Sequence, residues 1–144
     1  MIAQQIRLKG WPVPLFAAPW AQGENLLQIG GKAVEGMEII IPFDINNPSP
    51  ALRAFKTRYQ ARFAHPPVFT AMYGYETMQM LAIALEKTGG KATGLPQTLL
   101  ELGDFEGLTG PIRLDEYGDA LRPLYIQRIH AGKFETIETL SPVP

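Results

Sequence analysis

The sequence contains no cysteine, which excludes a disulfide framework, a thiolate nucleophile and any metal site built on sulfur ligands. An excess of one charge is lacking too, because 13 basic and 14 acidic residues leave a net charge of −1 among 144 residues. This balance provides no basic surface for nucleic acid, so no nucleic-acid partner is expected. The longest apolar stretch, residues 37–43, is far shorter than the roughly 20 residues of a membrane span.

Glycine and proline, in contrast, are abundant. The 14 glycines and 13 prolines make 27 of 144 residues, about 19% against a usual ~12%. This excess favours many short elements separated by turns over a helical bundle. Hydrophobic residues make up 46% of the chain and charged residues 19%, so a sizeable core is available and disorder is a poor interpretation.

The periodicity predicts helices and strands that alternate, followed by a closing hairpin. Ser49 and Pro50 are a favourable N-cap and first residue for a helix that runs to about Phe63. Residues 69–88 carry apolar side chains on several sides, which predicts a helix covered on more than one face. The fold class is therefore α/β. The other elements are expected at 1–9, 24–29 and 95–102 (helices), 15–18 (a buried strand), 36–41 and 110–114 (strands), and 124–129 with 134–137 (a hairpin joined to the strands 15–18 and 36–41).

Three longer motifs carry a family resemblance. They are an A-x-E-G-strand-P-aromatic run at 33–43, a Tyr-led helix ending in A-L-E-K-x-G at 75–89, and GLTGPIRLDEYGD at 107–119. Together they resemble the C-terminal part of the branched-chain amino-acid binding proteins, the type I periplasmic solute-binding receptors of ABC importers. The resemblance spans nearly all of residues 3–138. It implies a fragment of a fold with two α/β lobes joined by three crossovers.

The resemblance also implies an organisation and a function. Residues 1–41 would belong to the second lobe, 42–121 to the first lobe, and 122–144 to the terminal strands of the second lobe. The chain would be part of a periplasmic or extracytoplasmic receptor that binds an amino acid or a related small carboxylate, aromatic ones included, and delivers it to an ABC permease. The segment MIAQQIRLKG lacks the apolar region of a signal peptide. Alternatives are a sensory or regulatory domain of the same fold, and a truncated remnant that binds nothing.

In such a receptor the ligand contacts are expected where strands end at the cleft between the lobes. Trp20 and Ala21 follow the strand at 15–18, Phe43 follows the strand at 36–41, and Tyr75 matches a tyrosine that the family often has near the hinge. Amino-acid-binding relatives often have an acidic residue at the position of Trp20, where it pairs with the α-ammonium group of the ligand. Trp20 instead favours an aromatic or apolar carboxylate, or a cation on the ring face. The alternatives are that Trp20 caps the sheet edge, Phe43 packs at the hinge and Tyr75 packs in the core.

No pattern for catalysis or for a metal or cofactor is found. The sequence contains no G-x-S-x-G, P-loop or H-E-x-x-H pattern, so an enzyme is not expected. Asp115, Glu116 and Asp119 are expected to form a solvated turn beside Gly118 rather than a metal loop. His65 and His130 have no second ligand at a suitable spacing. The sequence therefore predicts no metal site and no cofactor.

A final expectation concerns assembly. If the chain is part of a two-lobe receptor, it should expose apolar surface that the rest of the receptor covers, and large patches of this kind are rare on monomers. We expect this surface on the helix at 69–88, and with it a homodimer of the fragment, a need for the rest of the receptor, or poor solubility. The residues expected to form the surface are Phe69, Met72, Tyr73, Met80, Leu81 and Leu85.

Overall fold

A computed structural model describes residues 1–142, and the chain divides into two compact units. The first unit is formed by Met1–Asp44 together with Leu124–Ser141, and the second by Ile45–Pro123. These boundaries lie within three residues of those expected at 41/42 and 121/122. The assignment of the units to lobes of a receptor stays a prediction, and residues 143 and 144 of its last segment lie outside the described residues.

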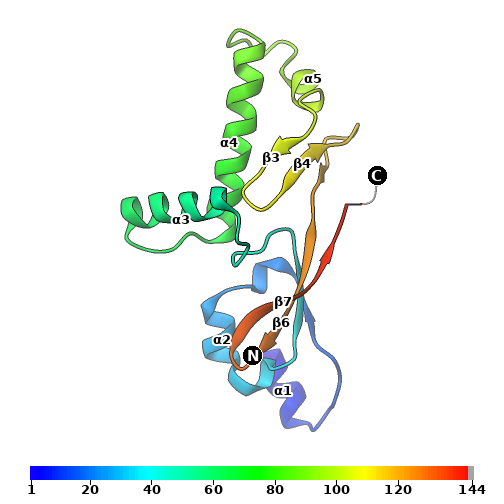
Figure 1. Ribbon diagram of the computed structural model, residues 1–144. Coiled ribbons are helices and arrows are strands. Elements are labelled where there is room, and N and C mark those ends of the chain that lie inside the picture. The colour runs from blue at the N-terminus through cyan, green and yellow to red at the C-terminus, as the bar shows by residue number, and fades with distance from the viewer. Residues whose placement is uncertain (143–144) are drawn as a thin grey trace. The chain divides into compact units, whose positions relative to one another are not determined.

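The first unit is built on a four-stranded sheet with the order β1-β2-β6-β7 (Figure 1). β1 and β2 are parallel, and the remaining pairs are antiparallel. The structure thus confirms that the C-terminal hairpin joins the sheet that contains the two earlier strands. The elements of this unit are α1 (Ile2–Leu8), β1 (Phe16–Ala17), η1 (Pro19–Ala21), α2 (Glu24–Gly30), η2 (Gly31–Val34), β2 (Glu38–Ile41), β6 (Leu124–His130) and β7 (Lys133–Leu140).

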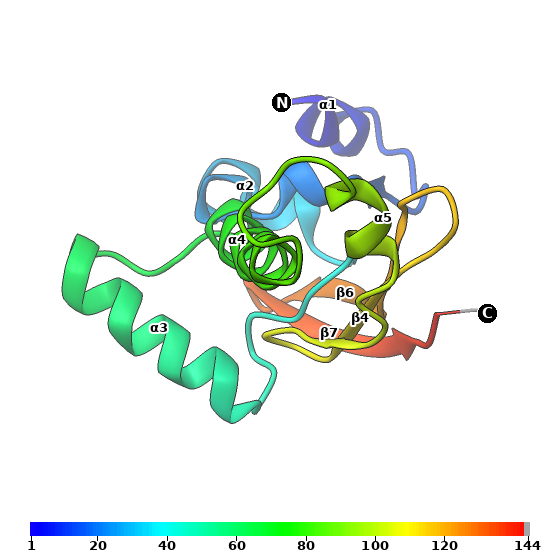
Figure 2. The same ribbon diagram turned by 90° about the horizontal axis from the view of Figure 1, so that it is seen from above.

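One face of this sheet carries the core of the unit. α1 and α2 lie on the same side of β6 and β7 (Figure 2). Ala3 of α1 and Val34 of η2 cluster with Ile129 of β6, and Leu26 of α2 packs on the same face of the sheet. The inward positions of β2 and β6 are at most 5% exposed, as alternation along a strand requires; they are Ile39, Ile41, Tyr125, Gln127 and Ile129.

The opposite face of the sheet, the open face, exposes apolar side chains. Phe16 is 72% exposed and Ile40 is 50% exposed. Phe16 is paired with Glu38, and the side chains of Glu38 and Ile40 lie on the same face because they are two positions apart. Phe16 and Ile40 therefore lie on the same face of the sheet. The expectation of a buried strand at 15–18 is therefore wrong: β1 has only two residues at the sheet edge, and its aromatic side chain lies on the open face.

The second unit combines three helices with a small antiparallel sheet of order β3-β4-β5 (Figure 1). The predicted capping is confirmed, because the Ser49 hydroxyl accepts hydrogen bonds from the backbone N–H groups of Ala51 and Leu52. β3 and β5 were not predicted, since two-residue strands are too short to show alternation. The elements are α3 (Pro50–Phe63), α4 (Phe69–Lys87), α5 (Leu95–Leu100), β3 (Phe105–Glu106), β4 (Pro111–Leu114) and β5 (Ala120–Leu121).

The fully buried residues of α4 lie along one stripe. The buried residues follow a spacing of four: Met72, Glu76, Met80 and Ala84. Met78, on another side of the helix, is 61% exposed. Tyr75, on a further side of α4, is half-buried and packs on Phe55 of α3. Of the apolar surface expected for self-association, Met72 and Met80 are buried and the other four residues are half-buried, so self-association through α4 stays a prediction.

A buried ion pair lies at the centre of the second unit. Glu76 of α4 accepts a hydrogen bond from the Arg122 Nη1 at 2.9 Å, and the two side chains are 3% and 10% exposed. The other carboxylate oxygen accepts the Leu108 N–H at 2.7 Å. A Cβ on Gly107 would lie 2.8 Å from that oxygen, so the turn needs glycine there. Beside the pair, burial raises the pKa of the Tyr73 hydroxyl, and the Arg122 guanidinium partly offsets the rise.

Candidate functional site

The carboxyl ends of β1 and β2 place two connecting segments at the same edge of the first unit. The two strands are adjacent and parallel, so the segments that follow them leave the sheet at the same edge. After β1 the chain forms the short 3-10 helix η1, and after β2 it continues through Pro42, Phe43 and Asp44. In open α/β sheets this edge is where ligands bind. We refer to residues 19–22 and 42–44 as the two edge segments.

Three of the four predicted ligand contacts lie in these edge segments. Trp20 is 76% exposed, so most of this residue is accessible from solvent. Ala21 is half-buried beside it. Phe43 is only 2% exposed, so its ring contributes to packing. Of the three residues, Trp20 offers the largest accessible surface.

The fourth predicted contact, Tyr75, lies on α4 in the second unit. Its hydroxyl accepts hydrogen bonds from the Arg58 Nη2 and the Gln79 Nε2, both at 3.1 Å. Its ring centroid lies 4.8 Å from that of Phe55 on α3. Tyr75 therefore connects α3 with α4 in the structure, and a role in ligand binding stays a prediction.

The sequence analysis missed a polar residue beneath the edge segments. Gln127 of β6 is 0% exposed and accepts a hydrogen bond from the Gln22 Nε2 at 2.7 Å. Its own Nε2 donates to Thr136 Oγ1 at 3.1 Å and approaches Asp44 Oδ1 at 3.4 Å. One signal was present in the sequence, since Gln127 is a polar residue at an inward position between Tyr125 and Ile129. The hydrogen-bond partners of Gln127 are distant in sequence, and no sequence pattern marked them as buried polar residues.

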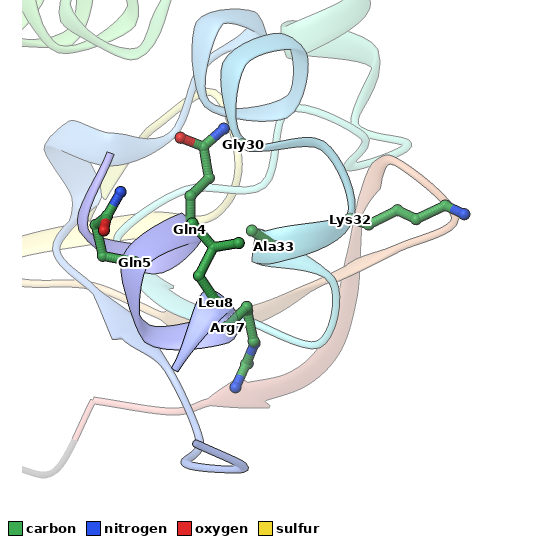
Figure 3. Close-up of a pocket in the computed structure, with 7 residues that line it drawn as sticks. All are labelled: Gln4, Gln5, Arg7, Leu8, Gly30, Lys32 and Ala33. Carbon is green, nitrogen blue, oxygen red and sulfur yellow. The ribbon is translucent and has the colours of Figure 1, made fainter. Parts of the chain in front are cut away.

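The structure also contains two hollows at the opposite end of the first unit. One, of about 630 Å³, lies between α1 and η2, and η2 precedes β2 in the chain (Figure 3). The Arg7 guanidinium donates to the backbone oxygens of Trp11 and Val13, and Lys32 points away from Arg7. The second hollow, of about 600 Å³, also includes Lys32. The polar groups of the first hollow do not converge, and neither hollow includes a predicted ligand contact.

The acidic segment after β4 forms the turn that the sequence predicted. Asp115 Oδ1 accepts the backbone N–H groups of Tyr117 and Asp119, each at 2.9 Å. Among residues 1–142, no three His, Asp or Glu side chains are grouped so that they could hold a metal ion. Within the same residues, no helix is both long and apolar enough to span a membrane.

Comparison with protein families places this geometry in a known context. The model of the family described as "Periplasmic binding protein" matches residues 2–133. The chain belongs to the periplasmic binding protein family. Its members are solute-binding receptors, among them the Leu/Ile/Val-binding proteins of ABC transporters, and the chain has the α/β fold of the type I periplasmic binding proteins. No curated protein matches the sequence.

Solved structures agree with this periplasmic binding protein fold. A leucine-binding protein from Thermotoga maritima is 24% identical with a TM-score of 0.85, and the match covers 98% of this chain and 41% of that protein. A branched-chain amino-acid transporter substrate-binding protein from Streptococcus pneumoniae, solved with isoleucine, is 26% identical (TM-score 0.79; 98% and 41% covered). A solute-binding protein from Rhodopseudomonas palustris, solved with 3,4-dihydroxybenzoic acid, is 24% identical (TM-score 0.74; 99% and 42% covered). The chain thus spans about 40% of the length of these proteins.

Proposed function

We propose that this chain forms the C-terminal part of an extracytoplasmic receptor that binds a small carboxylate for an ABC importer. The observation that supports it is the exposed indole of Trp20 at the carboxyl end of β1, next to a second edge segment that follows the parallel strand β2. In this proposal the first unit belongs to one lobe and the second unit to the other. The receptor binds its solute without chemical conversion and releases it to the permease.

The proposed ligand class is an aromatic or otherwise flat carboxylate. An indole supplies a large apolar surface on which a ring can stack, with little loss of side-chain entropy. It carries no negative charge to pair with an α-ammonium group, so an aliphatic amino acid gains less at this position. Similar proteins have been solved with an aliphatic amino acid and with an aromatic carboxylate: one structure holds isoleucine and another holds 3,4-dihydroxybenzoic acid.

Isothermal titration calorimetry of the purified chain tests this proposal. Benzoate, 3,4-dihydroxybenzoate and leucine are titrated under the same conditions, with acetate as a control for carboxylate binding without a ring. We expect the two benzoates to bind more tightly than leucine, and acetate not to bind. Binding of leucine alone would contradict the proposed ligand class. The absence of heat with all four compounds would contradict ligand binding by this chain.

We also propose that two copies of the chain associate through the open face of the sheet. Apolar side chains gathered on an exposed face often mark a protein–protein interaction site. In the described part of the first unit, the core clusters place α1, α2 and η2 on the face of Ile39 and Ile41. The opposite face exposes Phe16 and Ile40, which a second copy can cover by isologous packing.

Light scattering coupled to size-exclusion chromatography tests the association. The chain should elute as a dimer, and Ile40→Lys should shift it to the monomer because a charge on the open face opposes burial. Ile83→Lys is the matched control, because Ile83 is an exposed isoleucine on α4 in the second unit. A monomeric parent chain, or equal effects of the two substitutions, would contradict the proposed surface.

A further inference from the structure

Gln127 has a side-chain hydrogen-bond partner in each of the two edge segments. Its Oε1 accepts from Gln22, at the end of the first segment, and its Nε2 lies 3.4 Å from Asp44 in the second segment. The same Nε2 donates to Thr136 of β7 at 3.1 Å. One fully buried amide therefore connects both edge segments to the two antiparallel strands of the sheet.

The chemistry of the partners fixes the orientation of this amide. A carboxylate only accepts hydrogen bonds, so the NH₂ group of Gln127 must face Asp44. Its carbonyl oxygen then faces Gln22, which must present its own NH₂ group. Each polar atom of the buried amide has a partner, and a buried amide left without partners would be costly. The arrangement thus has one favourable geometry rather than several of similar energy.

The strands themselves do not require this connection. β6 pairs with β7 over Leu124–His130, with one register shift at Ile126/Gln127, and with β2 over residues 125–128. Gln22, in contrast, lies in neither a helix nor a strand, and its backbone N–H bonds locally to the Pro19 oxygen. The side-chain bond to Gln127 reaches across 105 positions of sequence and ties the end of the Trp20 turn to the sheet.

We propose that Gln127 is a positioning residue, which fixes the Trp20 segment relative to the segment of Phe43 and Asp44. This role rests on the proposed function, because it matters for binding only if these segments contact the solute. Preorganised contacts avoid the entropy cost of ordering a loop when the ligand binds. Loss of the Gln22–Gln127 bond should therefore loosen Trp20 and weaken ligand binding together.

A double-mutant cycle on Gln22 and Gln127 tests this inference. All variants carry Trp11→Phe, so that Trp20 is the single tryptophan. Gln22→Met, Gln127→Met and the double variant are compared with Gln4→Met. Gln4 is the matched control, because its Nε2 donates to the Ile29 oxygen at 2.8 Å in the same unit but lies beside the hollow of Figure 3. The readouts are Trp20 fluorescence anisotropy without ligand, benzoate affinity, and far-UV circular dichroism.

Each single variant should lower the Trp20 anisotropy and weaken benzoate binding by roughly 2- to 12-fold, the range of one net hydrogen bond. The double variant should be no worse than the more affected single variant, because both remove the same bond. Gln4→Met should leave anisotropy and affinity unchanged.

The readouts separate the possible failures. Unchanged anisotropy in Gln127→Met, with native circular dichroism, would overturn the positioning role. If Gln127→Met does not fold, Gln22→Met replaces it as the test, because Gln22 is only half-buried. An unchanged Trp20 anisotropy in Gln22→Met would then overturn the positioning role. If the parent chain does not bind benzoate but the anisotropy falls as expected, the positioning role stands and the proposed function fails.

Discussion

Replacement of Glu76 by alanine should lower the free energy of unfolding of the second unit by about 3–5 kcal/mol. The substitution leaves the Arg122 guanidinium, whose side chain is 10% exposed, without its carboxylate. It also removes the acceptor of the buried Leu108 N–H. An uncompensated buried charge costs much more than the loss of an ordinary surface pair. We therefore expect Glu76→Ala to be among the most damaging single substitutions in this chain.

Urea unfolding followed by two probes can assign this effect to the correct unit. Both tryptophans lie in the first unit, whereas the long helices α3 and α4 lie in the second. Far-UV circular dichroism should therefore show an earlier transition in Glu76→Ala, while the tryptophan fluorescence transition changes less. Arg113→Ala is the control, since the Arg113–Asp104 pair is more than half exposed on both sides. Equal midpoints for Glu76→Ala and Arg113→Ala would contradict a stabilising role for the buried pair.

A double substitution distinguishes charge burial from simple loss of packing. Glu76→Met with Arg122→Met removes both charges and keeps comparable side-chain volume. Replacement of a buried ion pair by apolar residues is often neutral or stabilising. The double variant should therefore recover much of the stability that Glu76→Ala loses. A double variant as unstable as Glu76→Ala would show that the hydrogen bond to Leu108, rather than the charge of Arg122, dominates.

The helices and the closing hairpin could be predicted because their signals are local. Ser49 and Pro50 specify the start of α3 through capping geometry that depends on a few adjacent residues. The side on which an element is buried depends on its neighbours and could not be predicted in the same way. Phe16 looked like a core residue by type, but a two-residue edge strand placed it on the open face.

The candidate site shows the same division between local and distant signals. Trp20 could be placed after a strand because glycine and proline mark the ends of the short elements around it. The buried network could not be predicted, since Gln22, Asp44 and Gln127 come from three separate parts of the chain. Only the fold brings them together. A polar residue at an inward strand position is the sequence feature that would have identified Gln127.

Replacement of Trp20 by alanine should weaken the binding of an aromatic carboxylate by about 2–4 kcal/mol, or roughly 30- to 1,000-fold in Kd. This is the cost of truncating a large aromatic contact that the bound ligand buries. Because Trp20 is 76% exposed, the same substitution should change the free energy of unfolding by only about 0.5 kcal/mol. A loss of affinity without a loss of stability is the expected signature of a contact residue.

Calorimetric titration of benzoate into the variants measures this effect. Trp20→Phe keeps an aromatic ring and should retain most of the affinity that Trp20→Ala loses. Trp11→Ala is the matched control, because Trp11 is 59% exposed in the same unit but lies between α1 and β1 rather than in an edge segment. If Trp20→Ala binds benzoate as tightly as the parent chain, the indole caps the sheet edge and does not contact the ligand. If Trp11→Ala causes an equal loss, the binding site lies nearer to α1 than to the carboxyl ends of β1 and β2.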